Sequence, residues 1–150
     1  KTLTVVYNNG ITDEWAFVNG QMLGESPYSV GWFLDAAYAN LADAEYEEGT
    51  VLMIGGENEV TACTIGSRAI GPVSKKPAYL MNKDLENGTA IALKGRVPVK
   101  VTGPIVKGQH LVAGPNGTAQ SAGSGNPDTF AIALASNADP LIKLVECLIL

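Results

Sequence analysis

Charge and cysteine are both scarce in this chain of 150 residues. Only 17% of the residues are charged, against roughly 25% in an average domain, while 46% are hydrophobic. The surface therefore carries little charge or is partly covered by other subunits, and oligomerisation is the simpler explanation. The cysteines, Cys63 and Cys147, form no CxxC motif, and His110 is the single histidine. We expect two small buried thiols and neither a metal site nor a disulfide framework.

Several other signals are missing, and each absence excludes a class of function. The net charge of −5 argues against nucleic-acid binding, because phosphate contacts need a basic surface. No apolar stretch approaches the roughly 18 residues that span a bilayer, so we expect no membrane insertion. GxSxG, HExxH, GxGxxG and phosphate-binding glycine-rich motifs are absent as well. We therefore expect no cofactor, and no enzymatic activity of these classes.

Glycine and proline are plentiful, with 17 and 8 residues. Such a composition is typical of many short strands joined by tight turns. We expect an all-β fold of mainly antiparallel strands, like a sandwich or barrel, in one domain over residues 1–150, with N-terminal strands and an arm in 1–37. The expected strands cover 2–7, 14–18, 51–54, 59–64, 70–74, 77–81, 89–95, 96–101, 109–112, 118–121, 130–135 and 141–150.

One segment departs from the strand pattern. Its apolar residues recur at spacings of three and four, as on one face of a helix: Trp32, Phe33, Ala36, Ala37 and Leu41. Ser29 is placed as an N-cap before them. The pattern predicts at most one short helix near 29–42, and an extended arm is the alternative.

The last ten residues are apolar at nearly every position. A strand half exposed to water would alternate, so this run should lie centrally in a sheet or against another chain. The expected subunit interface comprises Trp32, Phe33, Leu41, Val145, Leu148 and Leu150. We expect the turns at Gly55-Gly56 and at 114–117 to project outward.

The densest group of ionisable residues is Asp43, Glu45, Glu47 and Glu48. Paired carboxylates can act as general acid and base when burial separates their pKa values, which makes Asp43, Glu45 and Glu47 the catalytic candidates. A solvated acidic turn is the simpler interpretation. Exposed aromatic side chains could instead stack on sugars, with Trp15 and Tyr79 as the ligand-binding candidates, or they could be core or trimer contacts.

Three ordered stretches resemble one family. These are AAYANLADAEYEEGTVL at 36–52, GGENEVT with IGPVSKKPAYLMN at 55–61 and 70–82, and GRVPVKV with GPIVKG at 95–101 and 103–108. They are similar to C-terminal regions of tailed-phage fibre and neck-appendage proteins, over about residues 38–122.

The resemblance implies a structural protein of the phage virion that forms a homotrimer, contacts other virion proteins and contributes to host recognition, with a surface glycan as one possible partner. It also implies an intramolecular chaperone, which in some members cuts itself from its parent chain through acidic residues. Here Asn40 and Asp43 stand where the family pattern has Asp and Glu. Loss of one carboxylate removes a general acid or base, which argues against self-cleavage. Autoproteolysis, capsid decoration and carbohydrate binding are the alternative functions.

Overall fold

The computed structural model describes residues 2–6, 12–18, 21–23 and 35–150, and contains no helix among them. The all-β prediction is therefore confirmed. Strands β1 (Thr2–Val6), β2 (Thr12–Val18) and β3 (Gln21–Leu23) form an antiparallel sheet in the order β1-β2-β3. In the part that the structure describes, no helix is long and apolar enough to cross a membrane.

The expected helix near 29–42 is replaced over its described part by strand β4 (Asp35–Asn40). Inside and outside positions alternate along β4, with Ala37 and Ala39 buried and Tyr38 exposed. The strand lies between β8 (Tyr79–Met81) and the long strand β9 (Thr89–Val101). Pairing on both edges outweighs a helical spacing whose members within β4 are the two alanines Ala36 and Ala37. Residues 29–34, with Trp32 and Phe33, lie outside the described residues.

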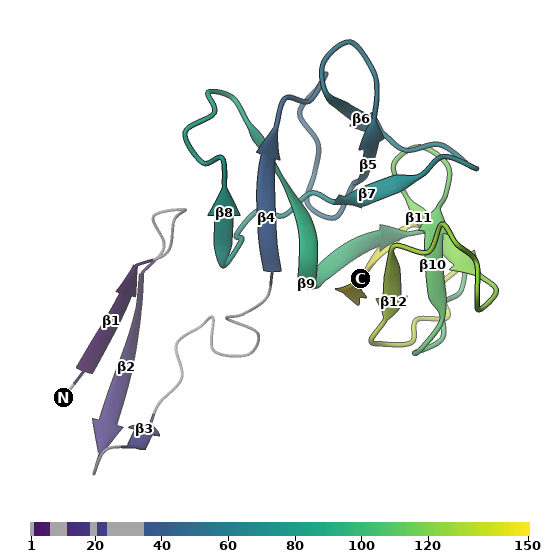
Figure 1. Ribbon diagram of the computed structural model, residues 1–150. Helices are drawn as coiled ribbons and strands as arrows, with labels where there is room; N and C mark the ends of the chain where they lie inside the picture. Colours follow the sequence, from purple (N-terminus) through teal and green to yellow (C-terminus); the bar gives the residue numbers. More distant parts are fainter. Residues whose placement is uncertain (1, 7–11, 19–20, 24–34) are drawn as a thin grey trace.

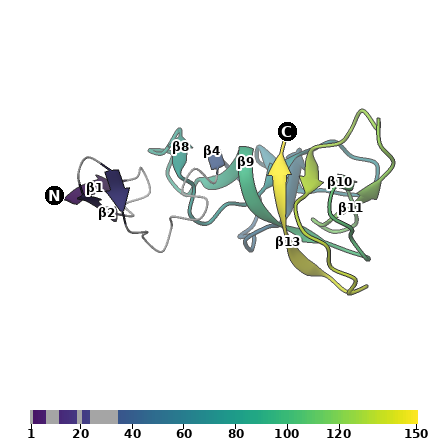
Figure 2. The same ribbon diagram turned by 90° about the horizontal axis from the view of Figure 1, so that it is seen from below.

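Seven strands form the main sheet, and five of them close into a barrel (Figures 1 and 2). The sheet order is β11-β10-β12-β13-β9-β4-β8, and β11 returns to β9 through Ala119 and Val101. That contact makes a ring of β9, β13, β12, β10 and β11. The remaining bounds are β10 (His110–Ala113), β11 (Ala119–Ala122), β12 (Ala131–Ala133) and β13 (Lys143–Ile149).

Strand β9 belongs to the barrel and to its extension. Its first half pairs with β4 and its second half with β13, and the two halves meet at Gly95, which pairs with both Asp35 and Ile149. Gly95 has a φ of 113°, a backbone conformation that favours glycine. The sequence predicts two strands here, at 89–95 and 96–101. The structure has one continuous strand, which bends at the glycine.

A proline in this strand costs no ladder hydrogen bond. Lys100 N donates to Gly49 O at 2.8 Å, on the side of β9 that faces away from β13. Pro98 lies two residues earlier and points the same way, so its missing N–H faces that side too. Pro98 therefore remains compatible with full pairing to β13.

The barrel interior holds the main hydrophobic core. The predicted alternation of Val97, Val99 and Val101 is confirmed, since all three are buried. Both cysteines are free and buried in the same core, as expected. Burial of apolar surface stabilises the folded state by about 25 cal/mol per Å². The core also contains Val51, Ala69, Ala92, Ile105, Leu111, Ala113, Ala119, Phe130, Ala131, Ala133, Val145 and Ile149.

A third sheet has the order β6-β5-β7, with β5 (Val51–Ile54), β6 (Val60–Ala62) and β7 (Ala69–Pro72). Strands β5 and β6 form the hairpin that the sequence predicts. A bridge between Val73 and Ile91 joins the end of β7 to β9. A second apolar cluster lies at this junction, formed by Leu52, Val60, Val73 and Ile91.

The turn at 114–117 projects only in part, since Asn116 is exposed but the glycines on either side of the tip are not. Gly117 N donates to Cys63 O at 2.9 Å, and Val51 N donates to Gly117 O at 2.8 Å. Gly114 and Gly117 are both buried. The turn is therefore held against the third sheet by backbone hydrogen bonds, whereas Gly56 in the β5–β6 loop is exposed.

Candidate functional site

An open hollow of about 1000 Å³ lies beside the segment that joins β4 to β5. Residues 43–48 of that segment, here called the acidic segment, carry Asp43, Glu45, Glu47 and Glu48. Glu45, Glu47 and Glu48 line the hollow, and Ser74, Lys75 and Thr89 lie among the residues of its other walls. The predicted catalytic group is thus partly gathered around one concave surface.

Side chains of the β5–β6 loop fix the start of the acidic segment. Glu59 Oε2 accepts from Leu41 N at 2.7 Å, and Asn58 Nδ2 donates to the carbonyl oxygen of Ala42 at 2.9 Å. Leu41 itself is half-buried rather than exposed. These bonds explain why a segment without regular structure keeps one path between two sheets.

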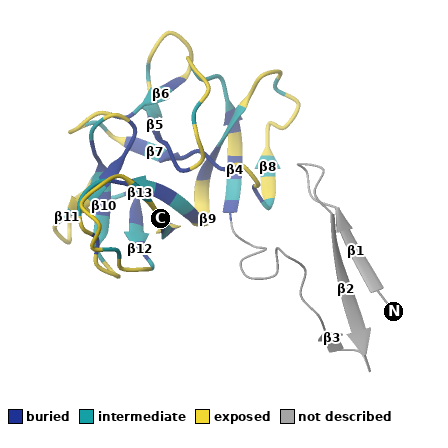
Figure 3. Cartoon of the chain, turned by 180° about the vertical axis from the view of Figure 1, so that it is seen from behind, coloured by how far each residue is buried: buried dark blue, intermediate teal, exposed yellow. Residues whose placement is uncertain are grey.

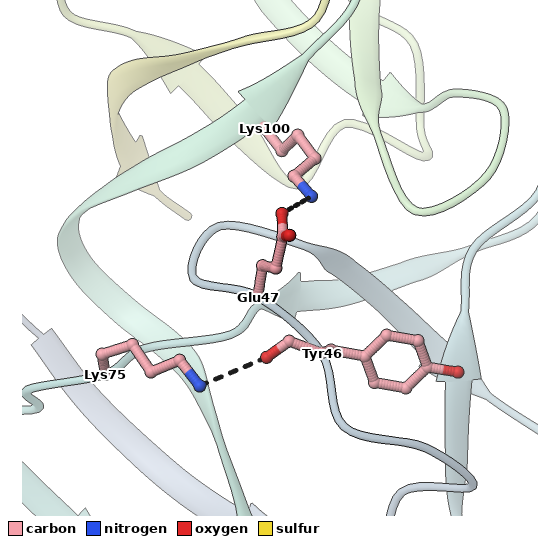
Figure 4. A network of polar contacts seen from close by, with 4 residues as sticks. All are labelled: Tyr46, Glu47, Lys75 and Lys100. Atoms are coloured by element: carbon pink, nitrogen blue, oxygen red, sulfur yellow. Dashed lines mark hydrogen bonds and ion pairs between the residues drawn. The ribbon is translucent and has the colours of Figure 1, made fainter.

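Two lysines flank the acidic segment (Figure 4). Lys100 on β9 forms an ion pair with Glu47 at 2.8 Å, while Lys75 Nζ donates to the carbonyl oxygen of Tyr46 at 3.3 Å. The Lys100 hydrogen bond and positive charge lower the pKa of Glu47. Glu47 is therefore a carboxylate at neutral pH and donates no proton there.

Asp43 is not among the residues that line the hollow, but its carboxylate is bonded to Tyr46, which is one of them. The Tyr46 hydroxyl donates to Asp43 Oδ1, and a further hydrogen bond from Thr61 adds to it. Both bonds favour the charged form and lower the pKa of Asp43. Neither Asp43 nor Glu47 thus has the raised pKa that a general acid at neutral pH needs, and among the described residues Glu45 makes no ion pair.

Asp35 is a carboxyl group whose pKa is shifted in the opposite direction, upward. It is 4% exposed, and burial raises its pKa, helped by the negative charge of Glu48. Hydrogen bonds from Ser74 and from Ala78 N oppose that rise. Its Oδ2 atom is buried and has no hydrogen-bond partner among the described residues. The sequence gives no sign of the burial of Asp35, because that burial depends on strand pairing.

The predicted interface residues near the end of the chain differ in their exposure to solvent. Val145 is buried inside the barrel, whereas Leu148 and Leu150 are 42% and 49% exposed. Leu144, which the sequence analysis did not single out, shares their outward side of β13 and is 49% exposed. Period-two alternation along 143–149 is the signal that distinguishes Val145 from its neighbours.

The two aromatic candidates for sugar stacking lie on different sheets, on β8 and on β2. Tyr79 lies on β8 and is 59% exposed. Trp15 belongs to β2, opposite Leu3, and its side chain lies outside the described part. Across the described residues, no group of histidine, cysteine and acidic side chains is arranged to hold a metal ion.

No family model and no curated protein matches the chain. Among solved structures, the chain is similar to gene product 12 of bacteriophage phi29 in its pre-mature form, with a TM-score of 0.62 and 12% sequence identity. The alignment covers 91% of this chain and 24% of the phage protein, so the chain spans about a quarter of its length. At this identity the likeness shows a shared fold.

Proposed function

We propose that this chain is a structural domain of a phage virion, part of a tail fibre or appendage, and that it assembles as a homotrimer. The observation that carries the proposal is the fold likeness to a bacteriophage protein over 91% of the chain. The ordered motifs between residues 38 and 122 support the same assignment independently, because they are features of sequence rather than of shape.

A row of exposed leucines supports the self-association. Leu144, Leu148 and Leu150 lie on the outward side of the chain's last strand and beyond its end. Nearby, Leu141 and Ile142 are 70% and 60% exposed. Several exposed apolar side chains close together, here interrupted on β13 by Glu146, are typical of protein–protein contacts. Burial of the row between copies is therefore the proposed driving force of assembly.

Host recognition is the second part of the proposal, with the β5–β6 loop as the contact. Gly56, Glu57 and Asn58 are exposed at its tip. Loops held on a rigid scaffold commonly carry binding residues, and carboxylate and amide groups can hydrogen-bond the hydroxyls of a surface glycan. Loss of adsorption to host cells by Glu57→Ala, with the oligomer intact, is the expected result, and unchanged adsorption would remove this loop from the proposal.

The molar mass in solution tests the assembly. Light scattering coupled to size exclusion should give three chains per particle, where one chain has a mass of 15.6 kDa. A particle of one chain at high protein concentration would end the proposal. Ile65→Asp is the matched control for an aspartate placed in the leucine row. Ile65 is 66% exposed on the loop after β6 and lies outside that row, so this variant should keep the mass of the wild-type particle.

A further inference from the structure

One outward side of the main sheet combines aromatic, apolar and basic side chains. Register places Tyr79 of β8 and Lys94 of β9 on either side of Ala36 in β4. Met81 and Tyr38 are paired one step further along, and all four side chains are exposed. Figure 3 shows the exposed positions on the adjacent strands β4 and β8.

The same side continues across β9 towards the barrel. Gly95 pairs with Asp35 and Ile149, which are both buried, so Gly95 faces inward and its neighbours Lys94 and Arg96 face outward. Arg96 pairs in turn with the exposed Leu148. We call this surface the basic face; it comprises Tyr38, Tyr79, Met81, Lys94, Arg96 and Leu148.

The charges on the basic face have no partner among the described residues. The two ion pairs found there join Lys83 to Asp84 and Lys100 to Glu47. Lys94 and Arg96 therefore stand exposed in a chain whose net charge is −5. An apolar surface carrying two cations is complementary to an exposed acidic segment.

The chain itself carries such a segment. Glu45 and Glu48 of the acidic segment are exposed and make no ion pair within the described part of the chain. A closed ring of three copies requires two different surfaces on each copy, because a three-fold contact joins one patch to another. The basic face and the acidic segment provide two such patches of opposite charge.

We propose that the basic face of one copy binds the acidic segment of the next copy in a head-to-tail ring. This inference rests on the proposed homotrimer and names the surfaces that meet in it. Tyr38, Tyr79, Met81 and Leu148 supply the buried apolar area, whereas Lys94 and Arg96 facing Glu45 and Glu48 fix the register and exclude the wrong orientation.

Charge reversal tests the pairing. Lys94→Glu with Arg96→Glu should reduce the particle from three chains to one, and Glu45→Lys with Glu48→Lys should do the same. The chain that carries all four changes should form trimers again, since attraction is restored with opposite sign. Circular dichroism and melting curves of each variant check that these exposed positions leave the fold intact, and Lys94→Gln with Arg96→Gln provides a milder second variant.

Mixing the two double variants gives a sharper readout. Each can bind the other at both surfaces, but a ring of three must contain one contact between identical, repelling copies. The mixture should therefore give particles of two chains in native mass spectrometry, without closed trimers. Weakening of the wild-type trimer by salt is also expected, as the Debye length falls from about 10 Å at 0.1 M to about 3 Å at 1 M.

The possible failures are distinguishable. If both double variants still form trimers, as the wild type does, the proposed pairing of surfaces is wrong while the homotrimer itself remains supported. A four-change variant that folds but does not assemble would also overturn it. A wild-type protein that is itself a single chain would remove the proposed function together with the pairing.

Discussion

Gly71 and Ala92 approach each other so closely that no side chain fits between them. A Cβ atom built on Gly71 would lie 2.0 Å from the carbonyl oxygen of Ala92, a backbone atom that cannot rotate away. Gly71 belongs to β7 and Ala92 to β9, so this approach is where the third sheet meets the main sheet. The junction depends on a residue without a side chain.

Gly71→Ala should destabilise the folded chain. Separation of β7 from β9 is needed to accommodate the methyl group, and overpacking of this kind costs about 1–3 kcal/mol. Thermal or denaturant unfolding measures the change. Gly123→Ala is the matched control, because no atom of the described residues lies within 4 Å of a Cβ built on Gly123. Equal stability of the two variants would mean that the sheets do not meet as described.

Much of this fold could be predicted from strand and turn signals. The hairpin of β5 and β6 follows from two apolar runs around glycines, and the β10–β11 hairpin follows from Pro115-Asn116-Gly117, where Asn116 and Gly117 have positive φ values. The sequence allowed a sandwich or a barrel but could not decide between them, since closure of the barrel rests on a single pairing of Ala119 with Val101. Alanine at such a site carries no signal of its partner.

The site was predicted only in part, for a related reason. The acidic segment is visible as a run of charges, but its partners Lys75 and Lys100 come from distant elements. The helical spacing around Ala36 and Ala37 gave the wrong element, because alanine fits helix and strand alike and pairing decides between them.

Substitutions at neighbouring positions of β13 should separate folding from assembly. Val145→Asp places a carboxylate in the barrel core and should abolish the folded state, as uncompensated burial of a charge is strongly unfavourable. Leu148→Asp, at a position 42% exposed, should leave the melting transition of the isolated chain intact but reduce the mass of the particle. Light scattering and circular dichroism give the two readouts. A trimer that tolerates Leu148→Asp would argue against the leucine row.

The thiols should be unreactive in the native protein. Burial raises the pKa of Cys63, while burial together with Glu146 raises the pKa of Cys147 to about 12. The thiolate is the reactive form, so both groups remain protonated as well as covered at about pH 8. Labelling with a thiol reagent should proceed only after unfolding, with two groups per chain. Rapid modification of either thiol in the native state would contradict the described core.

Asp35 should make the chain less stable as pH rises. Its pKa in the folded state is raised above the ordinary value of 3.8, so the native chain binds this proton more tightly than the unfolded chain does. The stabilising effect of that proton is complete below about pH 4 and is lost as pH rises through the folded-state pKa. Asp35→Asn, which resembles the protonated form, should therefore melt at a higher temperature than the wild type at neutral pH.

The same experiment contains its own control in Asp43, whose pKa is shifted in the opposite direction. Hydrogen bonds from Tyr46 and Thr61 lower it, so the charged form stabilises the native state above about pH 4, and that contribution disappears as pH falls through the lowered pKa. Asp43→Asn should lower the melting temperature at neutral pH, whereas Asp35→Asn raises it, and both differences should vanish in acid, where every carboxyl is protonated. Shifts of the same sign at neutral pH would show that burial does not govern Asp35, and the unpartnered Oδ2 atom would then require a hydrogen-bond donor from outside the described residues.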